Sequence, residues 1–389
     1  MVVEVTSQSW FGRIRESFKS FLFGIALFIG AFPVLFLNEG RAVKTEKSLE
    51  EGQGAVVSVK ADRVDPENEQ KLVHLSGRAV TDEKLSDAEF GISANAIKLR
   101  RNVEMYQWKE KKESTTDKKT GGGSTTRTTY TYSKEWSKDL ENSSDFKEAD
   151  THQNPSTLPY ESKVAVAEVV TLGAFTLPAS LVGRIDEFEA VRVEDQVAAL
   201  PAELKNKVKI HDGTYYMGND PKVPEVGDVR ISFATVNPAE VSVVSKQVSN
   251  TFEAYHASAG MDVELLERGV RTAESMFQSA LARNTMLTWI LRGVGFIMMF
   301  LGLVMFFRPI SVLGDVIPLI GSMLAFGTGL FALFIAAALS IGTVGVAWVI
   351  YRPVLGIILL SVAIAALVAL AVSGRKKVAA ASAAAPVNA

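Results

Sequence analysis

Long apolar stretches lie near both ends of the chain, and a polar stretch separates them. Residues 21–37 and 289–373 carry few charges, whereas the residues between them hold most of the Asp, Glu, Lys and Arg. The first stretch, FLFGIALFIGAFPVLFL, is near the minimum length that crosses a hydrocarbon core of roughly 30 Å. The pattern predicts an integral membrane protein whose helical spans anchor one large water-soluble domain.

The first apolar stretch fits either a cleaved signal peptide or a permanent anchor. Residues 38–41 (NEGR) lack the small-x-small pattern of a cleavage site, so we interpret residues 21–37 as an uncleaved first span. Pro33 predicts a kink near its far end. In residues 1–20, Trp10 begins an apolar face at helical spacing. This face fits equally an interfacial amphipathic helix in a cytoplasmic tail and an extension of the anchor helix.

The C-terminal apolar stretch begins with a predicted second span at residues 289–307, which we expect to stop at Arg308 and Pro309. The charge-poor stretch that follows is about twice as long as a bilayer requires. We therefore divide it into an interfacial segment, 311–319, and a long tilted third span, 320–349. The alternative is two short spans that fold back near residues 340–345.

A fourth span is predicted at residues 354–373, before an Ala-rich cytoplasmic tail at residues 374–389. No span carries a charge near its centre, which disfavours a transporter because pumps keep their ion relays there. Small residues at four-residue spacing predict close helix packing, within one chain or between chains: Ala332, Ala336 and Ser340, then Ser361, Ala365 and Ala369. The predicted interfacial anchors are Trp10, Trp289, Arg292, Trp348, Tyr351 and Arg352.

Basic residues predict the orientation. Arg375, Lys376 and Lys377 follow the last span, and further basic residues precede the first, which places both termini in the cytoplasm by the positive-inside rule. The large domain then lies outside, in a bacterial periplasm or in the lumen of the endoplasmic reticulum and nuclear envelope. Arg41 and Lys44, just beyond the first span, weaken this signal.

The extracytoplasmic domain, residues 38–285, is predicted to be α+β and mostly β, with its strands in a barrel or sandwich. Residues 109–129 lack apolar side chains and predict a long flexible hairpin tip. Helices are expected within 185–206 in part and at about 262–283, where Leu266 and Val270 would begin an apolar stripe. The expected strands are residues 71–77, 101–108, 130–136, 162–170, 229–234 and 240–252.

Composition narrows the possible chemistry. A net charge of −2 gives no general attraction to nucleic acid, and the absence of cysteine excludes disulfides and thiolate metal sites. The four histidines are far apart in sequence and make no local zinc motif. Neither a nucleophile elbow nor a phosphate-binding glycine loop is present, so the sequence predicts no enzyme, cofactor or metal.

One group of aromatic residues flanks the predicted hairpin and is the candidate interaction surface: Tyr106, Trp108, Tyr130, Tyr132 and Trp136. Such rings can stack on a ligand ring or sugar. More often they pair across strands as part of a core or rim.

Several short motifs, in order along the chain, resemble the transmembrane protein 43 family, also called LUMA. They are residues 38–42 (NEGRA), 66–69 (PENE) leading to 72–74 (LVH), 98–101 (KLRR), 103–108 (VEMYQW), 154–156 (NPS), 224–228 (PEVGD) and 351–353 (YRP). Together these motifs span the chain from about residue 10 to residue 373.

The resemblance implies four spans, a large luminal or extracytoplasmic domain built around an OB-type barrel, self-association and no established enzymatic activity. For animal relatives it also implies residence in the endoplasmic reticulum and inner nuclear membrane, with lamins and emerin as partners. The Gly- and Thr-rich loop and the Ala-rich tail depart from the animal pattern and fit a bacterial member, to which nuclear partners cannot be transferred.

Three functions are consistent with these features. The first is a non-enzymatic membrane scaffold that self-associates and organises protein or lipid partners, whose protein partners the sequence does not name. The second is an accessory module whose OB-like groove binds a lipid, a glycan or a membrane enzyme. The third is a hydrolase assembled from distant residues, which would require buried histidines beside carboxylates.

Overall fold

The computed structural model describes residues 1–358 and residue 361, and the chain divides into two compact units. The β unit comprises Met1–Ser7, Ser48–Asp117 and Thr125–Ala280. The helical unit comprises Gln8–Lys47, Lys118–Ser124 and the described residues from Leu281 onward. Most of the water-soluble domain predicted at residues 38–285 lies in the β unit, which also includes the N-terminal residues, whereas residues 38–47, 118–124 and 281–285 belong to the helical unit.

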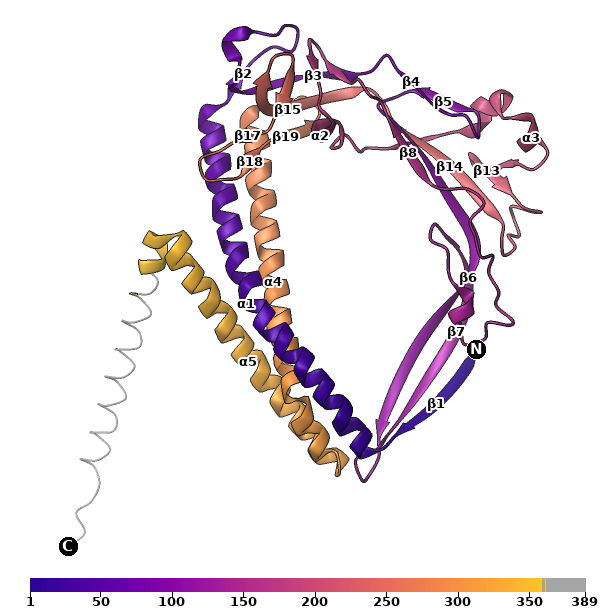
Figure 1. Cartoon of the computed structure of the whole chain (residues 1–389), viewed down its shortest axis with the longest axis vertical. Coiled ribbons are helices and arrows are strands. Elements are labelled where there is room, and N and C mark those ends of the chain that lie inside the picture. Colours follow the sequence, from indigo (N-terminus) through magenta and orange to yellow (C-terminus); the bar gives the residue numbers. More distant parts are fainter. Residues whose placement is uncertain (359–360, 362–389) are drawn as a thin grey trace. The chain divides into compact units, whose positions relative to one another are not determined.

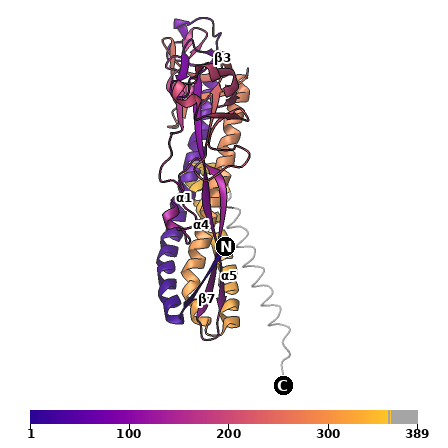
Figure 2. The same cartoon turned by 90° about the vertical axis from the view of Figure 1, so that its right-hand side faces the viewer.

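Three helices of the described chain are long and apolar enough to cross a membrane: α1 (Trp10–Ala55), α4 (Ala273–Gly314) and α5 (Pro318–Tyr351). Within the helical unit they run side by side (Figure 1, Figure 2). Their shared core contains Leu35, Met299 and Ala332. A Cβ atom on Gly24 would lie 2.7 Å from the carbonyl oxygen of Gly302. Glycine at both positions therefore lets α1 and α4 approach closely.

The structure corrects several predicted helix boundaries. Residues 10–20 extend the anchor helix, which continues through Pro33 to Ala55, so there is no separate amphipathic helix in residues 1–20. Helix α4 likewise continues through Pro309 to Gly314, so the predicted stop at Arg308 is wrong. Apolar helices tolerate proline because neighbouring helices and local adjustments satisfy the freed carbonyl groups.

Residues 311–319, predicted as an interfacial segment, are not a separate element: residues 311–314 end α4, a short turn follows, and α5 begins at Pro318. Their position at the membrane interface stays a prediction. Proline suits the first position of α5 because it has no N–H to leave unpaired. Helix α5 is unbroken to Tyr351, which excludes two spans folding back near residues 340–345. Only the beginning of the predicted fourth span is described, and Ala365 and Ala369 lie outside the described residues.

The β unit contains two large sheets, and their strands and bounds are as follows. The eight-stranded sheet has the order β1 (Val2–Gln8), β7 (Ser124–Ser137), β6 (Lys98–Lys118), β14 (Val229–Val236), β13 (Thr214–Met217) and β12 (Lys209–His211), with β11 (Glu189–Val191) beside β14 and β8 (Lys163–Val166) beside β6. The seven-stranded sheet has the order β10 (Phe175–Thr176), β9 (Thr171–Leu172), β3 (Leu72–Val80), β15 (Ala239–Val248) and β16 (Thr251–Glu253), with β19 (Leu265–Arg268) beside β15 and β2 (Val57–Ser58) beside β3.

Smaller elements complete the unit. They are the strand pairs β4 (Lys84–Asp87) with β5 (Ile92–Asn95) and β17 (Tyr255–His256) with β18 (Asp262–Val263), the helices α2 (Ala179–Val182) and α3 (Ala202–Lys205), and 3-10 turns at Pro66–Asn68, Ser143–Asp145 and Val193–Ala199. One core packs on the seven-stranded sheet around Leu75 and Phe175, and a second packs on the eight-stranded sheet around Phe90 and Tyr215. Leu85 packs against both.

Four of the six predicted strands are confirmed in position, whereas 162–170 is strand only over β8 and 240–252 is divided by a turn between β15 and β16. The predicted flexible tip at residues 109–129 is wrong in extent. Strand β6 runs to Lys118 and β7 resumes at Ser124, so the turn is confined to the few residues between them. The hydroxyl groups of Ser114 and Thr128 lie 3.0 Å apart. Cross-strand hydroxyl pairs and β-branched threonines favour extended strands even without an apolar face.

The predicted helix at 262–283 is also corrected, since α4 begins only at Ala273. Leu266 belongs to strand β19, and Val270 is exposed in the segment that follows it. Within 185–206 only short turns and α3 are helical. Leu266 lies in a sheet because β19 pairs with β15. The spacing of apolar residues along the chain does not reveal this pairing.

Candidate functional site

The five predicted aromatic residues separate into three groups in the β unit. In the first group, the ring centroids of Tyr106 and Trp136 are 5.3 Å apart, and Trp136 also contacts Tyr216 at 6.1 Å. The guanidinium group of Arg230 lies 4.6 Å from the Trp136 ring centroid. Burial raises the pKa of Tyr216, whose hydroxyl also donates to Asp228. Neighbouring side chains therefore occupy the faces of this group.

The second group is built around His152. Its ring stacks on Tyr132 with centroids 3.8 Å apart and meets Trp108 edge-on at 4.6 Å. The Lys134 ammonium lies 4.7 Å from the Trp108 centroid. The Tyr132 hydroxyl donates to Glu110 over 2.8 Å. Burial, followed by this hydrogen bond, raises the pKa of Tyr132 to about 12, so the phenol stays protonated as a donor.

Tyr130 forms the third group with the N-terminal strand. Its hydroxyl donates to Glu4 of β1 over 2.9 Å, and the Lys147 ammonium donates to the same carboxylate over 2.9 Å. The hydrogen bonds from Lys147 and then Tyr130 lower the pKa of Glu4. All five aromatic residues thus have partners within the chain, which favours cross-strand packing over an open stacking platform for a ligand.

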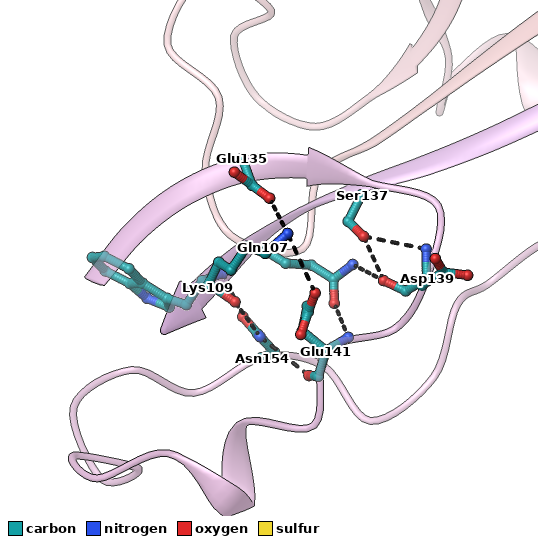
Figure 3. A network of polar contacts seen from close by, with 8 residues as sticks. Gln107, Lys109, Glu135, Ser137, Asp139, Glu141 and Asn154 are labelled. Atoms are coloured by element: carbon teal, nitrogen blue, oxygen red, sulfur yellow. Dashed lines mark hydrogen bonds and ion pairs between the residues drawn. The ribbon is translucent and has the colours of Figure 1, made fainter. Parts of the chain in front are cut away.

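A network of amide side chains fastens the segment after β7 to strand β6 (Figure 3). The Gln107 side chain donates to the Asp139 carbonyl over 3.0 Å and accepts from the Glu141 backbone N–H over 2.9 Å. Asn154 accepts from the Trp108 backbone N–H over 2.7 Å and donates back to its carbonyl over 2.9 Å. These side-chain amides form hydrogen bonds with backbone N–H and C=O groups, as a neighbouring strand would. The network therefore has a structural role.

The histidines do not form a hydrolytic centre in the described part of the chain. His74 is buried, with its Nδ1 3.2 Å from the Ser58 hydroxyl and its Nε2 2.8 Å from the Arg271 carbonyl oxygen. Burial lowers the pKa of His74, and its ring is oriented by these neutral groups instead of by a carboxylate. His211 and His256 lie beside aspartates but are not buried. Among the described residues, no group of three metal-ligating side chains converges.

A buried carboxylate joins the three helices of the helical unit. The Glu39 side chain on α1 is 2% exposed and accepts from Arg292 Nε and Nη2 over 2.6 and 2.8 Å. Trp348 Nε1 on α5 donates to the same carboxylate over 2.7 Å. The Arg292 guanidinium also lies 4.6 Å from the Trp289 ring centroid. Three predicted interfacial anchors, Trp289, Arg292 and Trp348, therefore converge on a glutamate that the sequence did not single out.

Two apolar grooves flank α5 within the helical unit. One, of about 610 Å³, lies between α1 and α5 and includes Phe36 and Gly342. The other, of about 540 Å³, lies between α4 and α5 and includes Phe296 and Gly345. Ala332, Ala336 and Ser340 are buried against the other helices, as expected for packing within one chain, and Ser361 donates back to the Ile357 carbonyl.

A second buried carboxylate lies at the turn between α4 and α5. The Asp315 side chain is 1% exposed, forms an ion pair with Arg13, and accepts from Lys118 Nζ over 2.7 Å. The predicted anchor Trp10 donates from Nε1 to the Val312 carbonyl over 3.0 Å, and its indole covers Gly122. The remaining predicted anchors, Tyr351 and Arg352, contact Phe36 and Glu46 respectively.

Asp315 is the one charged residue between Val312 and Tyr351, and the sequence assigned a role neither to it nor to Glu39. A single acidic residue within an apolar stretch is the signal that could have identified Asp315, because such a charge needs a partner. Its partners Arg13 and Lys118 are distant in sequence, and nothing in the local pattern connects them.

The pairing of β1 with β7 bears on membrane orientation. Strand β1 and residues 48–117 belong to the same unit, although residues 21–37 separate them in sequence. Hydrogen-bonded strands lie on the same side of a bilayer, because hydrocarbon excludes unpaired backbone. Paired with β7, strand β1 therefore lies in the same unit as the rest of the β domain.

Comparison with known proteins identifies the family. The model of the family described as Transmembrane protein 43 matches residues 105–353. The chain is 37% identical to Transmembrane protein 43 of Mus musculus, covering 90% of each chain, and 35% identical to that of Homo sapiens, covering 93% of this chain and 92% of the relative. The Drosophila melanogaster homolog is 33% identical over 89% of this chain and 93% of its own length. No solved structure matches. With three apolar helices and these relatives, the chain is a membrane protein that belongs to the transmembrane protein 43 family.

Proposed function

We propose that this protein is a non-enzymatic multipass membrane scaffold that self-associates and organises protein or lipid partners at the membrane through its β domain. The observation that carries the proposal is the pair of apolar grooves along α5. A Cβ atom added at Gly342 or at Gly345 would meet no heavy atom of the described chain within 4 Å, so each glycine leaves room for a close neighbour. Small residues along an apolar groove are the surface against which a further membrane helix packs.

The test is the mass of the protein extracted in detergent. We expect an oligomer for the natural chain and a shift toward monomer for Gly342→Leu combined with Gly345→Leu. Association should weaken about tenfold or more, because overpacking costs about 1–3 kcal/mol. Gly327→Leu is the matched control, since Gly327 is an equally open glycine on α5 that lines neither groove. A monomeric natural chain would contradict self-association.

The fourth span at residues 354–373 and an OB-like core for the β domain remain part of the proposal. Residues 353–358 begin a helical segment after the bend at Arg352, which supports a fourth span. The OB-like core is supported by the family resemblance and by a β unit made of two large sheets.

An accessory binding module is the second candidate, supported by a pocket of about 170 Å³ in the β unit. Charged side chains line it, including Arg184, Glu187, Glu189 and Arg268. Arg268 forms an ion pair with Glu187 and lies 3.8 Å from Glu189. A mixed-charge pocket of this size suits a small zwitterionic or peptide group better than the ligand ring or sugar considered at the aromatic residues.

Two observations predict different orientations for the first apolar segment. Basic residues predict both termini in the cytoplasm, with the β domain in the periplasm of a bacterial inner membrane or, in eukaryotic relatives, in the endoplasmic reticulum lumen. The pairing of β1 with β7 predicts that the N-terminus shares the side of the β domain.

Single cysteines distinguish these orientations, since the natural chain has none. Ser7→Cys and Ser144→Cys introduce exposed thiols in β1 and in the segment after β7. In sealed vesicles we expect a membrane-impermeant maleimide to label both variants from the same side. Labelling from opposite sides would show that β1 leaves β7 when α1 crosses the bilayer.

A further inference from the structure

One end of the helical unit carries an excess of positive charge. Three segments form this end: residues 8–20 at the start of α1, residues 118–124 at the hairpin tip, and residues 308–316 at the turn between α4 and α5. Together they contain six basic and two acidic side chains. We call this set of three segments the basic end.

The two acidic side chains of the basic end are already occupied. Asp315 is buried between Arg13 and Lys118, and Glu16 accepts from the Gln8 side chain over 2.7 Å. Four basic side chains remain exposed. In the described part of the chain none of them contacts a carboxylate: Arg15, Lys19, Lys119 and Arg308. The excess charge therefore faces the surroundings.

Exposed apolar side chains alternate with these cations. Phe11 is 76% exposed and Phe18 is 56% exposed on α1, and Leu313 is exposed on α4. Because the apolar spans begin next to the basic end, its level along the helices is the boundary between hydrocarbon and water. Aromatic rings and long basic side chains interleaved at that level are typical of contact with lipid headgroups.

The hairpin tip is held at this level by specific contacts. Arg13 Nη1 donates to the Gly122 carbonyl over 2.6 Å, and the Gly121 N–H donates to the Val316 carbonyl over 2.9 Å. Gly122 has a φ of +81° and lies against the Trp10 indole, so no side chain fits there. These contacts fix a strand connection from the middle of the sequence beside the helix ends and so add Lys119 to the basic residues of α1.

We propose that the basic end binds the headgroups of anionic phospholipids in the adjoining leaflet, and that the hairpin tip contributes to this site. The inference extends the lipid-organising part of the proposed function. Each basic side chain near an anionic surface strengthens binding about fivefold. Exposed cations at the headgroup level are screened by salt, so the preference should weaken as ionic strength rises.

The experiment uses the full chain in nanodiscs of phosphatidylcholine mixed with phosphatidylglycerol, followed by measurement of the lipids retained on extraction. We expect the natural chain to retain phosphatidylglycerol above its bulk proportion. The triple variant Arg15→Gln, Lys19→Gln, Lys119→Gln should weaken this retention by roughly one to two orders of magnitude. Lys119→Gln alone should weaken it about fivefold, which isolates the contribution of the hairpin tip.

The matched control removes three exposed lysines of the β unit with the same change in net charge: Lys138→Gln, Lys205→Gln and Lys207→Gln. It should leave retention unchanged. Retention in the bulk proportion by the natural chain, or an equal loss in the control, would overturn the proposal. The oligomeric mass of the same samples is read separately, so failure of self-association is distinguishable from failure of lipid binding.

Discussion

The two buried carboxylates of the helical unit are paired with different sets of hydrogen-bond donors. Glu39 is paired with one arginine and one indole N–H, all supplied by the three apolar helices. Asp315 is paired with two cations, one from the start of α1 and one from the hairpin tip. The Glu39 cluster therefore involves only the three helices. The Asp315 cluster also involves Lys118, which lies between segments of the β domain in the sequence.

The difference lies in the number of cations beside each carboxylate. Arg292, 19% exposed, is the one cation of the described chain bonded to Glu39, whereas Asp315 is paired with both Arg13, 12% exposed, and Lys118, 31% exposed. An ionised group that loses its partner in a buried site is strongly destabilising, and a group that can reach water is less so. We therefore expect a substitution of Glu39 to lower the free energy of unfolding more than a substitution of Asp315.

The largest effect is expected for Glu39→Ala. This change leaves Arg292 without its carboxylate and removes the acceptor of Trp348, so the free energy of unfolding should fall by about 3 kcal/mol or more. Thermal unfolding of the purified protein in detergent measures the effect. Glu16→Ala is the control, because Glu16 is an exposed acidic residue of the same helix. Equal melting temperatures for the Glu39 variant and the natural chain would refute the role assigned to Glu39.

A smaller effect is expected for Asp315→Asn. Lys118 can turn toward water and Arg13 keeps the Gly122 carbonyl as an acceptor, so we expect a loss of about 1–2 kcal/mol. The change should be local, and hydrogen exchange should accelerate at residues 118–124 while the core around Met299 stays protected. Uniform acceleration through all three helices would mean that Asp315 supports the whole bundle, and the contrast with Glu39 would disappear.

The polar hairpin shows where local patterns mislead. Residues 109–129 lack the apolar side chains on which a core is built, and that composition predicted disorder. The structure instead forms a continuous ribbon, because Ser114, Thr116, Thr126 and Thr128 pair their hydroxyl groups across the strands. Leu266 illustrates the opposite error. Its spacing with Val270 predicted a helix, but Leu266 lies in strand β19.

The sequence by itself determined that apolar helices flank a mostly β domain, where the longest strands of this domain lie, and the family to which the chain belongs. These features depend on hydropathy over long windows, on strand composition and on ordered motifs, all of which are local. Only the tertiary structure decided that Glu39 and Asp315 are buried and paired, that the aromatic rings have intramolecular partners, and that β1 joins the sheet of the β domain. Each of these depends on contacts between residues far apart in the chain, and a buried charge or an edge strand carries no local sign of the partner that satisfies it.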